Sequence, residues 1–428
     1  MQKTLRERDE AVVWHPFTQM KTAGPAIPVV SGNGVELFDE EGNCYLDVIA
    51  SWWMTLHGHG HPYIAKRIAE QANKLEHVIF ASFTHEPAIE LAERLLDKLP
   101  ANQSKIFYSD NGSTSCEVAV KMCFQYWHNK GDKRKKMIAL DDAYHGDTFG
   151  AMSVGGRGPF VEPFMPFLFD VAFIDAPVAG EEEKVLKQLE GILKGGDVAG
   201  FIFEPLVQGS AGMRMYSPEV LEKMLSMCKE YGVLTVADEV MTGFGHLGKF
   251  FAVDYVDTKP DIICMSKGLT GGTMAMGATS CTQDIFDAFW DDEFLNAFLH
   301  GHSATGNPLA CAAALASMDL MDNPETQKNI DRIASRNAEF AKKLEQYPIY
   351  ANVRHIGVIL AMEVVTDEEN NYFNSLRDTI WQFLIKKGLL MRPLGNTVYI
   401  LPPYCITDEQ LDKAYDAIIE LAGFLTKN

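Results

Sequence analysis

Residues 198–239 read VAGFIFEPLVQGSAGMRMYSPEVLEKMLSMCKEYGVLTVADE, a stretch in which a strand, a helix and a second strand follow one another. The apolar runs 198–203 and 233–237 have the length and composition of buried strands. Between them, Ser217 is suited to cap a helix and Pro218 to occupy its first position. This order predicts parallel strands that are joined by a crossover helix.

The sequence on either side continues the same alternation. Further strands are expected at residues 105–108, 136–140, 261–265 and 276–281. The predicted fold class is therefore α/β, with a mainly parallel sheet in a large domain over residues 60–325. Residues 326–428 contain helical patterns and short strands near 354–364 and 397–401. We expect them to join residues 1–59 in a smaller α/β domain.

Composition and charge exclude several classes of protein. The chain has 428 residues, of which 47% are hydrophobic and 22% charged, so disordered, collagen-like and coiled-coil classes are excluded. With 38 basic and 58 acidic residues, the net charge of −20 argues against a nucleic acid or an anionic membrane as partner.

The expected compartment is the cytoplasm. The charged N-terminal segment lacks the apolar run of a signal peptide, and no apolar stretch reaches the roughly 18 residues of a membrane span. The eight cysteines are scattered singly with no CxxC pair, which indicates mostly buried free thiols in a reducing compartment.

A candidate anion site follows the strand at 105–108, where residues 109–117 read SDNGSTSCE. A helical pattern comes next, and Thr114 with Glu117 matches a capping box. Gly112 and Ser113 would then lie where the first amides of the helix point outward. Small residues, free amides and the positive end of the helix dipole together favour a bound anion such as phosphate. An ordinary capped helix is the alternative.

Two further strand ends carry reactive residues. Asp238 and Glu239 follow one apolar run, where a carboxylate can bind metal, pair with a cation or cap a turn. Lys267 lies between the strand at 261–265 and a glycine-rich turn, a poor place for a solvated surface charge. Burial would lower the pKa of its amine and make it a nucleophile for Schiff-base chemistry.

These features form one set, because ligands of open α/β sheets gather at the carboxyl ends of the strands. A phosphate site, an acid and a reactive lysine match what pyridoxal phosphate requires: the acid keeps the pyridine nitrogen protonated and the lysine carries the aldehyde. An aromatic residue must also cover the ring, and Tyr144, after the strand at 136–140, is well placed to do so.

Two other motifs are weaker. Residues 243–248, GFGHLG, match the GxGxxG pattern of a nicotinamide-dependent dehydrogenase, but no helical pattern follows them as a dinucleotide site requires. His57, His59 and His61 could bind metal. Alternating glycines and Pro62 instead favour a tight loop, and no acidic or cysteine partner stands nearby in the sequence, so no metal is predicted.

The whole chain resembles the class III pyridoxal-phosphate-dependent aminotransferases. Asp238 and Lys267, 29 residues apart (267 − 238), fall in the family's order with the Asn111-Gly112-Ser113 turn, Tyr144-His145-Gly146 and Gly306-Asn307-Pro308. The resemblance implies the type I fold of these enzymes, pyridoxal 5'-phosphate as cofactor and a homodimer with shared active sites.

Longer matches resemble the biotin-pathway members of this family. They are residues 14–20 (WHPFTQM), 51–53 (SWW), 144–153 (YHGDTFGAMS) and 401–404 (LPPY). These members transfer an amino group to 8-amino-7-oxononanoate, usually from S-adenosylmethionine, and the resemblance implies that reaction here. Lysine as donor, or a general ω-amino acid aminotransferase, are the alternatives.

The resemblance also implies roles for individual residues. Lys267, Asp238 and Tyr144 are the catalytic residues, Lys267 as the cofactor-binding lysine and proton shuttle. The cofactor-binding residues are Gly112, Ser113, Tyr144, His145, Asp238 and Lys267, with His302 and Ser303 reaching across a dimer interface. The substrate-binding residues are Phe17, Trp52, Trp53, Tyr144, Asp147, Gly301, Arg392 and Tyr399. Arg392 is the expected clamp for a distal carboxylate, since a guanidinium binds a carboxylate bidentately.

Three positions depart from the pattern of the adenosylmethionine-using enzymes. Phe17 stands in place of a tyrosine, His246 in place of an arginine and Leu394 in place of a phenylalanine. We expect all three around the donor pocket, so the identity of the donor stays open.

Overall fold

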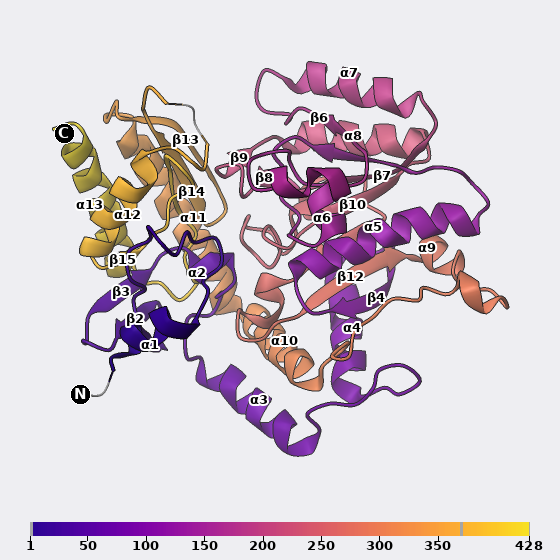
Figure 1. The fold of residues 1–428 in the computed structure, drawn as a ribbon, viewed down its shortest axis with the longest axis horizontal. Helices are drawn as coiled ribbons and strands as arrows, with labels where there is room; N and C mark the ends of the chain where they lie inside the picture. The colour runs from indigo at the N-terminus through magenta and orange to yellow at the C-terminus, as the bar shows by residue number, and fades with distance from the viewer. Residues whose placement is uncertain (1–2, 369–370, 428) are drawn as a thin grey trace.

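A seven-stranded sheet forms the centre of the larger part of the molecule (Figure 1). The computed structural model describes residues 3–368 and 371–427. The strand order is β4-β12-β11-β10-β7-β5-β6. The bounds are Gln103–Ser109 (β4), Lys136–Leu140 (β5), Val171–Ile174 (β6), Val198–Phe203 (β7), Leu234–Asp238 (β10), Ile262–Met265 (β11) and Gly277–Thr282 (β12). β12 runs antiparallel to both of its neighbours, and the pairs among the other strands are parallel.

The predicted mainly parallel α/β sheet is confirmed, and each of the six predicted strands lies within two residues of an observed one. β6, a strand of four residues, was not predicted. The crossover helix α8 (Pro218–Glu230) also begins as predicted: the Ser217 hydroxyl accepts a hydrogen bond from the Val220 amide at 3.3 Å. Gly232, just beyond its end, has φ +61°.

Helices cover both faces of this sheet. One face packs against α5 (Gly112–Asn129), and the other packs against α4 (Glu86–Lys98), α7 (Glu182–Leu193), α8 and α10 (Pro308–Met321). The remaining helices of this part are α3 (Pro62–Lys74), α6 (Phe149–Ser153) and α9 (Gln283–Asp287). Because both faces are covered, the ends of the strands are the places where polar side chains reach open space.

Both ends of the chain meet in a second, smaller group of sheets. β1 (Val29–Asn33), β2 (Glu36–Asp39) and β3 (Cys44–Asp47) form a sheet with β15 (Leu389–Leu390), which runs parallel to β3. β13 (Tyr350–Ile356), β14 (Ile359–Val364) and β16 (Thr397–Ile400) form another, and a small pair joins β8 (Val207–Gln208) to β9 (Arg214–Met215). The indigo N-terminal and yellow C-terminal elements lie together on the left of Figure 1.

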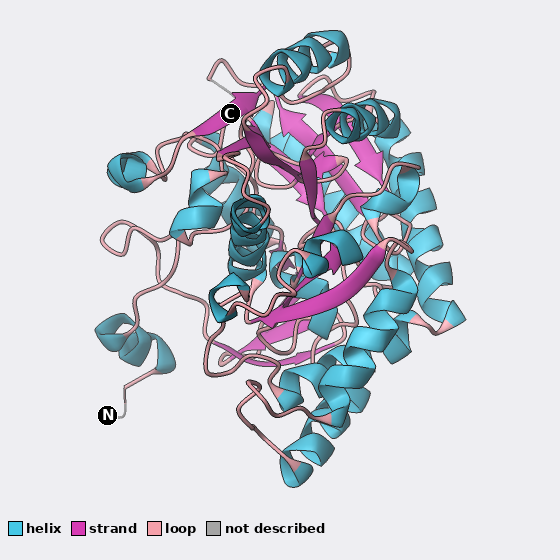
Figure 2. Ribbon diagram, turned by 90° about the vertical axis from the view of Figure 1, so that its right-hand side faces the viewer, coloured by secondary structure: helices cyan, strands magenta, loops and turns pink. Residues whose placement is uncertain are grey.

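Four helices accompany these sheets: α2 (Ala50–Trp53), α11 (Pro324–Leu344), α12 (Leu376–Lys386) and α13 (Asp408–Leu425). The N-terminal helix α1 (Leu5–Val12) buries none of its residues and stands at the edge of the molecule in Figure 2. Among the described residues, no helix combines the length and apolar content needed to cross a membrane. Six of the eight cysteines are buried, while Cys44 and Cys405 are exposed.

Candidate active site

The carboxyl ends of the central strands surround a cavity of about 600 Å³. Its wall brings together residues from the β4–α5 turn, from the loop after β5 and from the ends of β10 and β11. Eight of the predicted site residues line it: Trp53, Gly112, Ser113, Tyr144, His145, Asp147, Asp238 and Lys267. The cavity therefore lies at the strand ends where these residues were predicted to gather.

The predicted anion site opens into this cavity, but its helix cap differs from the prediction. The helix α5 begins at Gly112, and the side chain of Asn111 accepts a hydrogen bond from the Thr114 amide at 2.9 Å. The proposed box of Thr114 and Glu117 is wrong. The Glu117 carboxylate instead accepts hydrogen bonds from the Thr148 hydroxyl at 2.6 Å and the Ala151 amide at 3.0 Å. With the cap moved to Asn111, the first free amides of α5 still face the cavity.

The loop after β5 holds this helix start from the outside. Ser113 Oγ accepts a hydrogen bond from the Thr148 amide at 2.9 Å. Gly146, at φ +122°, passes so close that a Cβ on it would lie 2.3 Å from the Cβ and Oγ of Ser113. Only glycine fits at this contact, which sets the width of the anion site.

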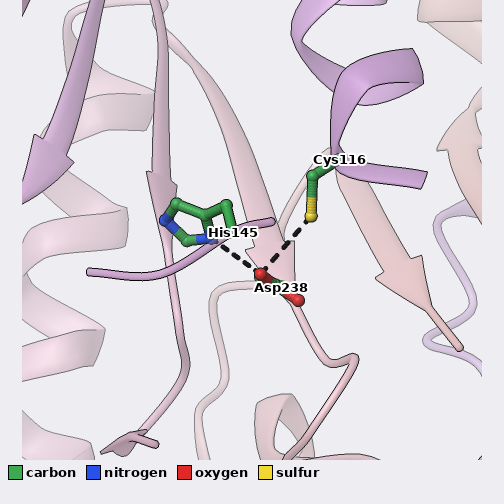
Figure 3. A group of neighbouring side chains, drawn as sticks. All are labelled: Cys116, His145 and Asp238. Atoms are coloured by element: carbon green, nitrogen blue, oxygen red, sulfur yellow. Dashed lines mark hydrogen bonds and ion pairs between the residues drawn. The ribbon is translucent and has the colours of Figure 1, made fainter. Parts of the chain in front are cut away.

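Asp238 is held by three hydrogen-bond donors, two of which, His145 and Cys116, are drawn in Figure 3. His145 Nδ1 lies 2.7 Å and Cys116 Sγ 3.4 Å from its Oδ2, while the Val240 amide donates to its Oδ1 at 3.0 Å. Burial alone would lower the pKa of His145, but the hydrogen bond with Asp238 and the charge of that carboxylate raise it to about 10. A protonated His145 thus places a positive charge against the Asp238 carboxylate inside the protein.

Cys116 remains a thiol and therefore a donor. Its pKa lies well above the usual value because of its hydrogen bond with Cys264, its burial and the charge of Asp238. The sequence singled out neither cysteine, and a lone buried cysteine gives no signal of such a contact.

The Lys267 amine is buried at the end of β11. Its Nζ lies 4.7 Å from the ring centroid of Trp53. Burial lowers the pKa of the amine, although the charges of Asp238 and Glu204 act in the opposite direction. The residue also adopts a left-handed φ of +42°, a strain that proteins keep chiefly where a side chain must be aimed. A lysine with a lowered pKa has a larger fraction of nucleophilic neutral amine.

Glu204 is a cavity residue that the sequence analysis missed. It directly follows β7, is buried, and accepts hydrogen bonds from the amides of Tyr144 at 3.1 Å and Gly209 at 2.9 Å. Burial raises its pKa to about 7. The rule that selected Asp238, a carboxylate directly after a buried strand, would have found it.

Two aromatic residues form the wall opposite the helix start. The Tyr144 side chain reaches the cavity, and its hydroxyl donates to Asp147 Oδ2 at 3.0 Å. The Trp53 Nε1–H donates to the Tyr399 hydroxyl at 2.9 Å. Trp53 and the two residues at the start of α2, Ala50 and Ser51, have φ between +48° and +65°, so a strained turn aims the indole at Lys267.

The other predicted substrate residues lie outside this cavity. Arg392 is part-buried, with its guanidinium 5.4 Å from the ring of Trp52. Phe17 packs edge-on against the same ring at 5.6 Å. Gly301, His302 and Ser303 precede α10 and do not line the cavity of their own chain.

None of the three departures from the family pattern lines the cavity. His246 is buried, its Nδ1 lies 2.5 Å from the carbonyl oxygen of Met241, and its ring packs against Tyr404. Burial lowers its pKa to about 4, so it is neutral. Leu394 packs against the hydrophobic core.

The two weaker motifs form turns. No helix follows residues 243–248 directly, and only the short 3-10 turn Ala252–Tyr255 comes next, as predicted. In the fold, the histidines at 57–61 do have an acidic neighbour, because His59 Nε2 lies 2.9 Å from Asp47 Oδ2. Asp47, the last residue of β3, supplies the carboxylate and lies 12 residues before His59 in the sequence.

The donor set fits pyridoxal phosphate. Free amides and the hydroxyl-bearing start of α5 suit its phosphate, the Asp238–His145 pair suits its ring nitrogen, and the buried amine of Lys267 suits its aldehyde.

Comparison with known proteins gives consistent results. The sequence profile described as aminotransferase class-III matches residues 18–421. The adenosylmethionine-8-amino-7-oxononanoate aminotransferase of Synechococcus elongatus is 45% identical over 417 residues, 96% of this chain and 98% of that protein. That of Helicobacter pylori is 35% identical over 438 residues and covers 100% of this chain and 99% of that protein.

Solved structures superpose over nearly the whole chain. The adenosylmethionine-8-amino-7-oxononanoate aminotransferase of Methanocaldococcus jannaschii has a TM-score of 0.91 at 36% identity and covers 97% of this chain and 98% of its own. A PMP-bound aminotransferase of Vibrio fluvialis has a TM-score of 0.91 at 28% identity and covers 99% and 98%.

Proposed function

Because the chain belongs to the class III aminotransferases, we propose that it transfers an amino group to 8-amino-7-oxononanoate and forms 7,8-diaminononanoate in biotin biosynthesis. The observation that carries the choice of acceptor is the level of identity. Relatives named for this reaction are 34–45% identical over at least 95% of the chain, whereas solved ω-transaminases are 24–28% identical.

Pyridoxal phosphate is the cofactor of the family. When bound, it supplies an aldehyde that accepts amines and a ring that stabilises negative charge on the adjoining carbon. In our assignment, the amides of Gly112 and Ser113 hold its phosphate, and Asp238 keeps its ring nitrogen protonated. Tyr144 packs over the ring.

Lys267 performs the proton transfers. Its lowered pKa provides a neutral amine that can take a proton from the donor carbon in the first half of the reaction, pass it on within that half, and deliver a proton to the acceptor carbon in the second half. Trp53, fixed by its hydrogen bond to Tyr399, covers this amine on one side. Since donor and acceptor use the same site in turn, ping-pong kinetics are expected.

For the remaining substrate contacts, we assign Arg392 to the distal carboxylate of the acceptor. Phe17, Trp52, Asp147 and Gly301 line the path to it. S-adenosylmethionine is the proposed donor. Phe17 lacks the hydroxyl of the tyrosine expected there, whereas His246 and Leu394 are packed inside the protein, which leaves one altered contact near the substrate.

We propose a homodimer in which His302 and Ser303 complete the phosphate site of the partner. Support comes from their position outside the cavity of their own chain and from exposed apolar side chains just before them: Trp290 is 76% exposed and Phe294 72%. The two domains proposed are residues 60–325 and residues 1–59 with 326–428; support comes from the pairing of β15 with β3, which joins the two chain ends in one sheet apart from the seven-stranded sheet. Six buried free cysteines support a cytoplasmic location.

The deciding experiment incubates the purified protein with 8-amino-7-oxononanoate and either S-adenosylmethionine or lysine, and quantifies 7,8-diaminononanoate by mass spectrometry. Product with adenosylmethionine alone supports the full proposal, and product with lysine alone corrects the donor. No product with either donor, together with turnover of other ω-amino acids, would establish the general aminotransferase instead.

A further inference from the structure

Five side chains form a closed ring of contacts beside the cavity. Arg392 lies over the Trp52 ring at 5.4 Å, and Trp52 contacts Phe17 edge-on at 5.6 Å. Phe17 contacts Phe160 at 6.1 Å, and Phe160 contacts Tyr372 at 5.2 Å. The ring closes where Arg392 donates a hydrogen bond to the Tyr372 hydroxyl at 3.0 Å. The five residues come from five separate segments of the chain, so the tertiary fold alone brings them together.

This ring adjoins the reactive amine. Trp52 directly precedes Trp53, whose indole lies against Lys267. Three of the aromatic members remain open to solvent, since Phe17 is 44%, Trp52 40% and Phe160 47% exposed. Apolar ring faces next to a guanidinium suit a ligand that has an alkyl chain ending in a carboxylate.

The partner of the guanidinium is unusual. Within the described ranges 3–368 and 371–427, Arg392 has no carboxylate within ion-pair distance, and its hydrogen-bond acceptor is the neutral Tyr372 hydroxyl. A part-buried guanidinium gains more from a bidentate carboxylate than from one neutral oxygen. A guanidinium without any acceptor would in turn lose the free energy of one hydrogen bond.

We propose that Tyr372 is a specificity-determining residue that occupies Arg392 whenever no substrate carboxylate is bound. Its hydroxyl gives way to an incoming aliphatic carboxylate and returns when a substrate without a distal carboxylate takes the site. One pocket can then serve two dissimilar substrates in turn without leaving the guanidinium unpaired. The proposal rests on the proposed function only for the identity of that carboxylate.

The test measures binding of octanoate to the cofactor-loaded protein by calorimetry, with octan-1-ol as the uncharged control. Tyr372→Phe keeps the aromatic ring and removes the competing hydroxyl. We expect this variant to bind octanoate about 2- to 10-fold more tightly, the range of one hydrogen bond, with the Kd of octan-1-ol changed less than twofold. Tyr231→Phe, a substitution at the end of α8, is the matched control and should change neither Kd.

Three results would overturn the proposal: an octanoate Kd that is unchanged or weaker in Tyr372→Phe, equal tightening for octanoate and octan-1-ol, or no octanoate binding to either protein. The gain must also disappear in an Arg392→Met background, because the hydroxyl acts only through the guanidinium.

Kinetics separate this proposal from the proposed function. With 8-amino-7-oxononanoate, Tyr372→Phe should lower the acceptor KM about 2- to 10-fold at unchanged kcat and should not lower the donor KM. An acceptor KM that is unchanged or raised would contradict competition between the Tyr372 hydroxyl and the substrate carboxylate for Arg392. If octanoate binding follows the expectation but 8-amino-7-oxononanoate is not converted, the competition at Arg392 stands and the proposed acceptor is wrong.

Discussion

Gly146→Ala tests the anion site at its narrowest contact. A Cβ at this position would lie 2.3 Å from the Cβ and Oγ of Ser113 and 2.5 Å from its Cα, whereas ordinary contacts begin at 3.4 Å. Ser113 would therefore have to retreat by about 1 Å from a tightly packed position. The residue also has φ +122°, which side chains rarely adopt.

Both effects have an expected size. Overpacking costs about 1–3 kcal/mol and the strained φ about 1–3 kcal/mol, so the cofactor-free variant should be less stable by about 2–6 kcal/mol. Displacing the start of α5 by about 1 Å misplaces the amides that bind phosphate, a displacement that can cost about 100-fold. We expect the Kd of pyridoxal phosphate to rise about 10- to 100-fold, or about 1.4–2.7 kcal/mol.

The assay titrates pyridoxal phosphate into the cofactor-free protein and follows the quenching of tryptophan fluorescence, with circular dichroism to establish that the variant is folded. Gly158→Ala is the control, because a Cβ on Gly158 meets no atom within 4 Å. It should bind the cofactor within twofold of the unmodified protein. A folded Gly146→Ala protein with unchanged cofactor affinity would refute the assignment of this turn as the phosphate site.

Three further predictions concern the residues around the cavity. Lys267→Ala should reduce kcat at least 10³-fold while cofactor still binds non-covalently, measured by turnover and by absorbance after dialysis; near-normal turnover would contradict its role. Cys116→Val should lower kcat/KM about 2- to 10-fold through loss of one hydrogen bond to Asp238, and Cys116→Ser should retain it; equal losses would indicate packing alone. Folding raises the pKa of Glu204 from 4.5 to about 7, so protonated Glu204 favours the folded state. Its contribution to the free energy of unfolding is fully present below about pH 4.5 and is lost as the pH rises through about 7. The melting temperature of cofactor-free Glu204→Gln should therefore fall less than that of the unmodified protein between these pH values, and parallel curves would count against a raised pKa.

Local sequence was sufficient for much of the fold. The α8 helix begins at the expected cap because Ser217 and Pro218 act within one turn of the chain. The cap of α5 was misplaced because Thr114 fits two overlapping capping boxes, one with Glu117 and one with Asn111. In the structure the Asn111 side chain accepts a hydrogen bond from the Thr114 amide, so Asn111 is the cap. The antiparallel direction of β12 could not be read from its residues, since period-2 patterning is the same in either direction.

Site residues that directly follow a strand were predicted from the sequence. Contacts between residues that are far apart in the sequence were missed. Asp238 and Lys267 each follow an apolar run, and Glu204 could have been found in the same way. The contacts of Asp238 with His145 and Cys116 join residues 93 and 122 positions apart, and no local pattern encodes them. The same is true of Arg392 and Tyr372, which meet because two loops converge.

The parallel pairing of β3 with β15 determines the order in which the site can be completed during synthesis. Leu46 pairs with Leu389, a residue made about 340 positions later, which at about 5–20 residues per second means roughly 20–70 s on the ribosome. Until then β3 pairs only with β2, and the turn at Ala50–Trp53, which directs Trp53 toward Lys267, lacks the Tyr399 hydroxyl to which Trp53 donates. A nascent chain therefore contains the strand ends that line the cavity before it contains the strand that pairs with β3 and the tyrosine that accepts from Trp53.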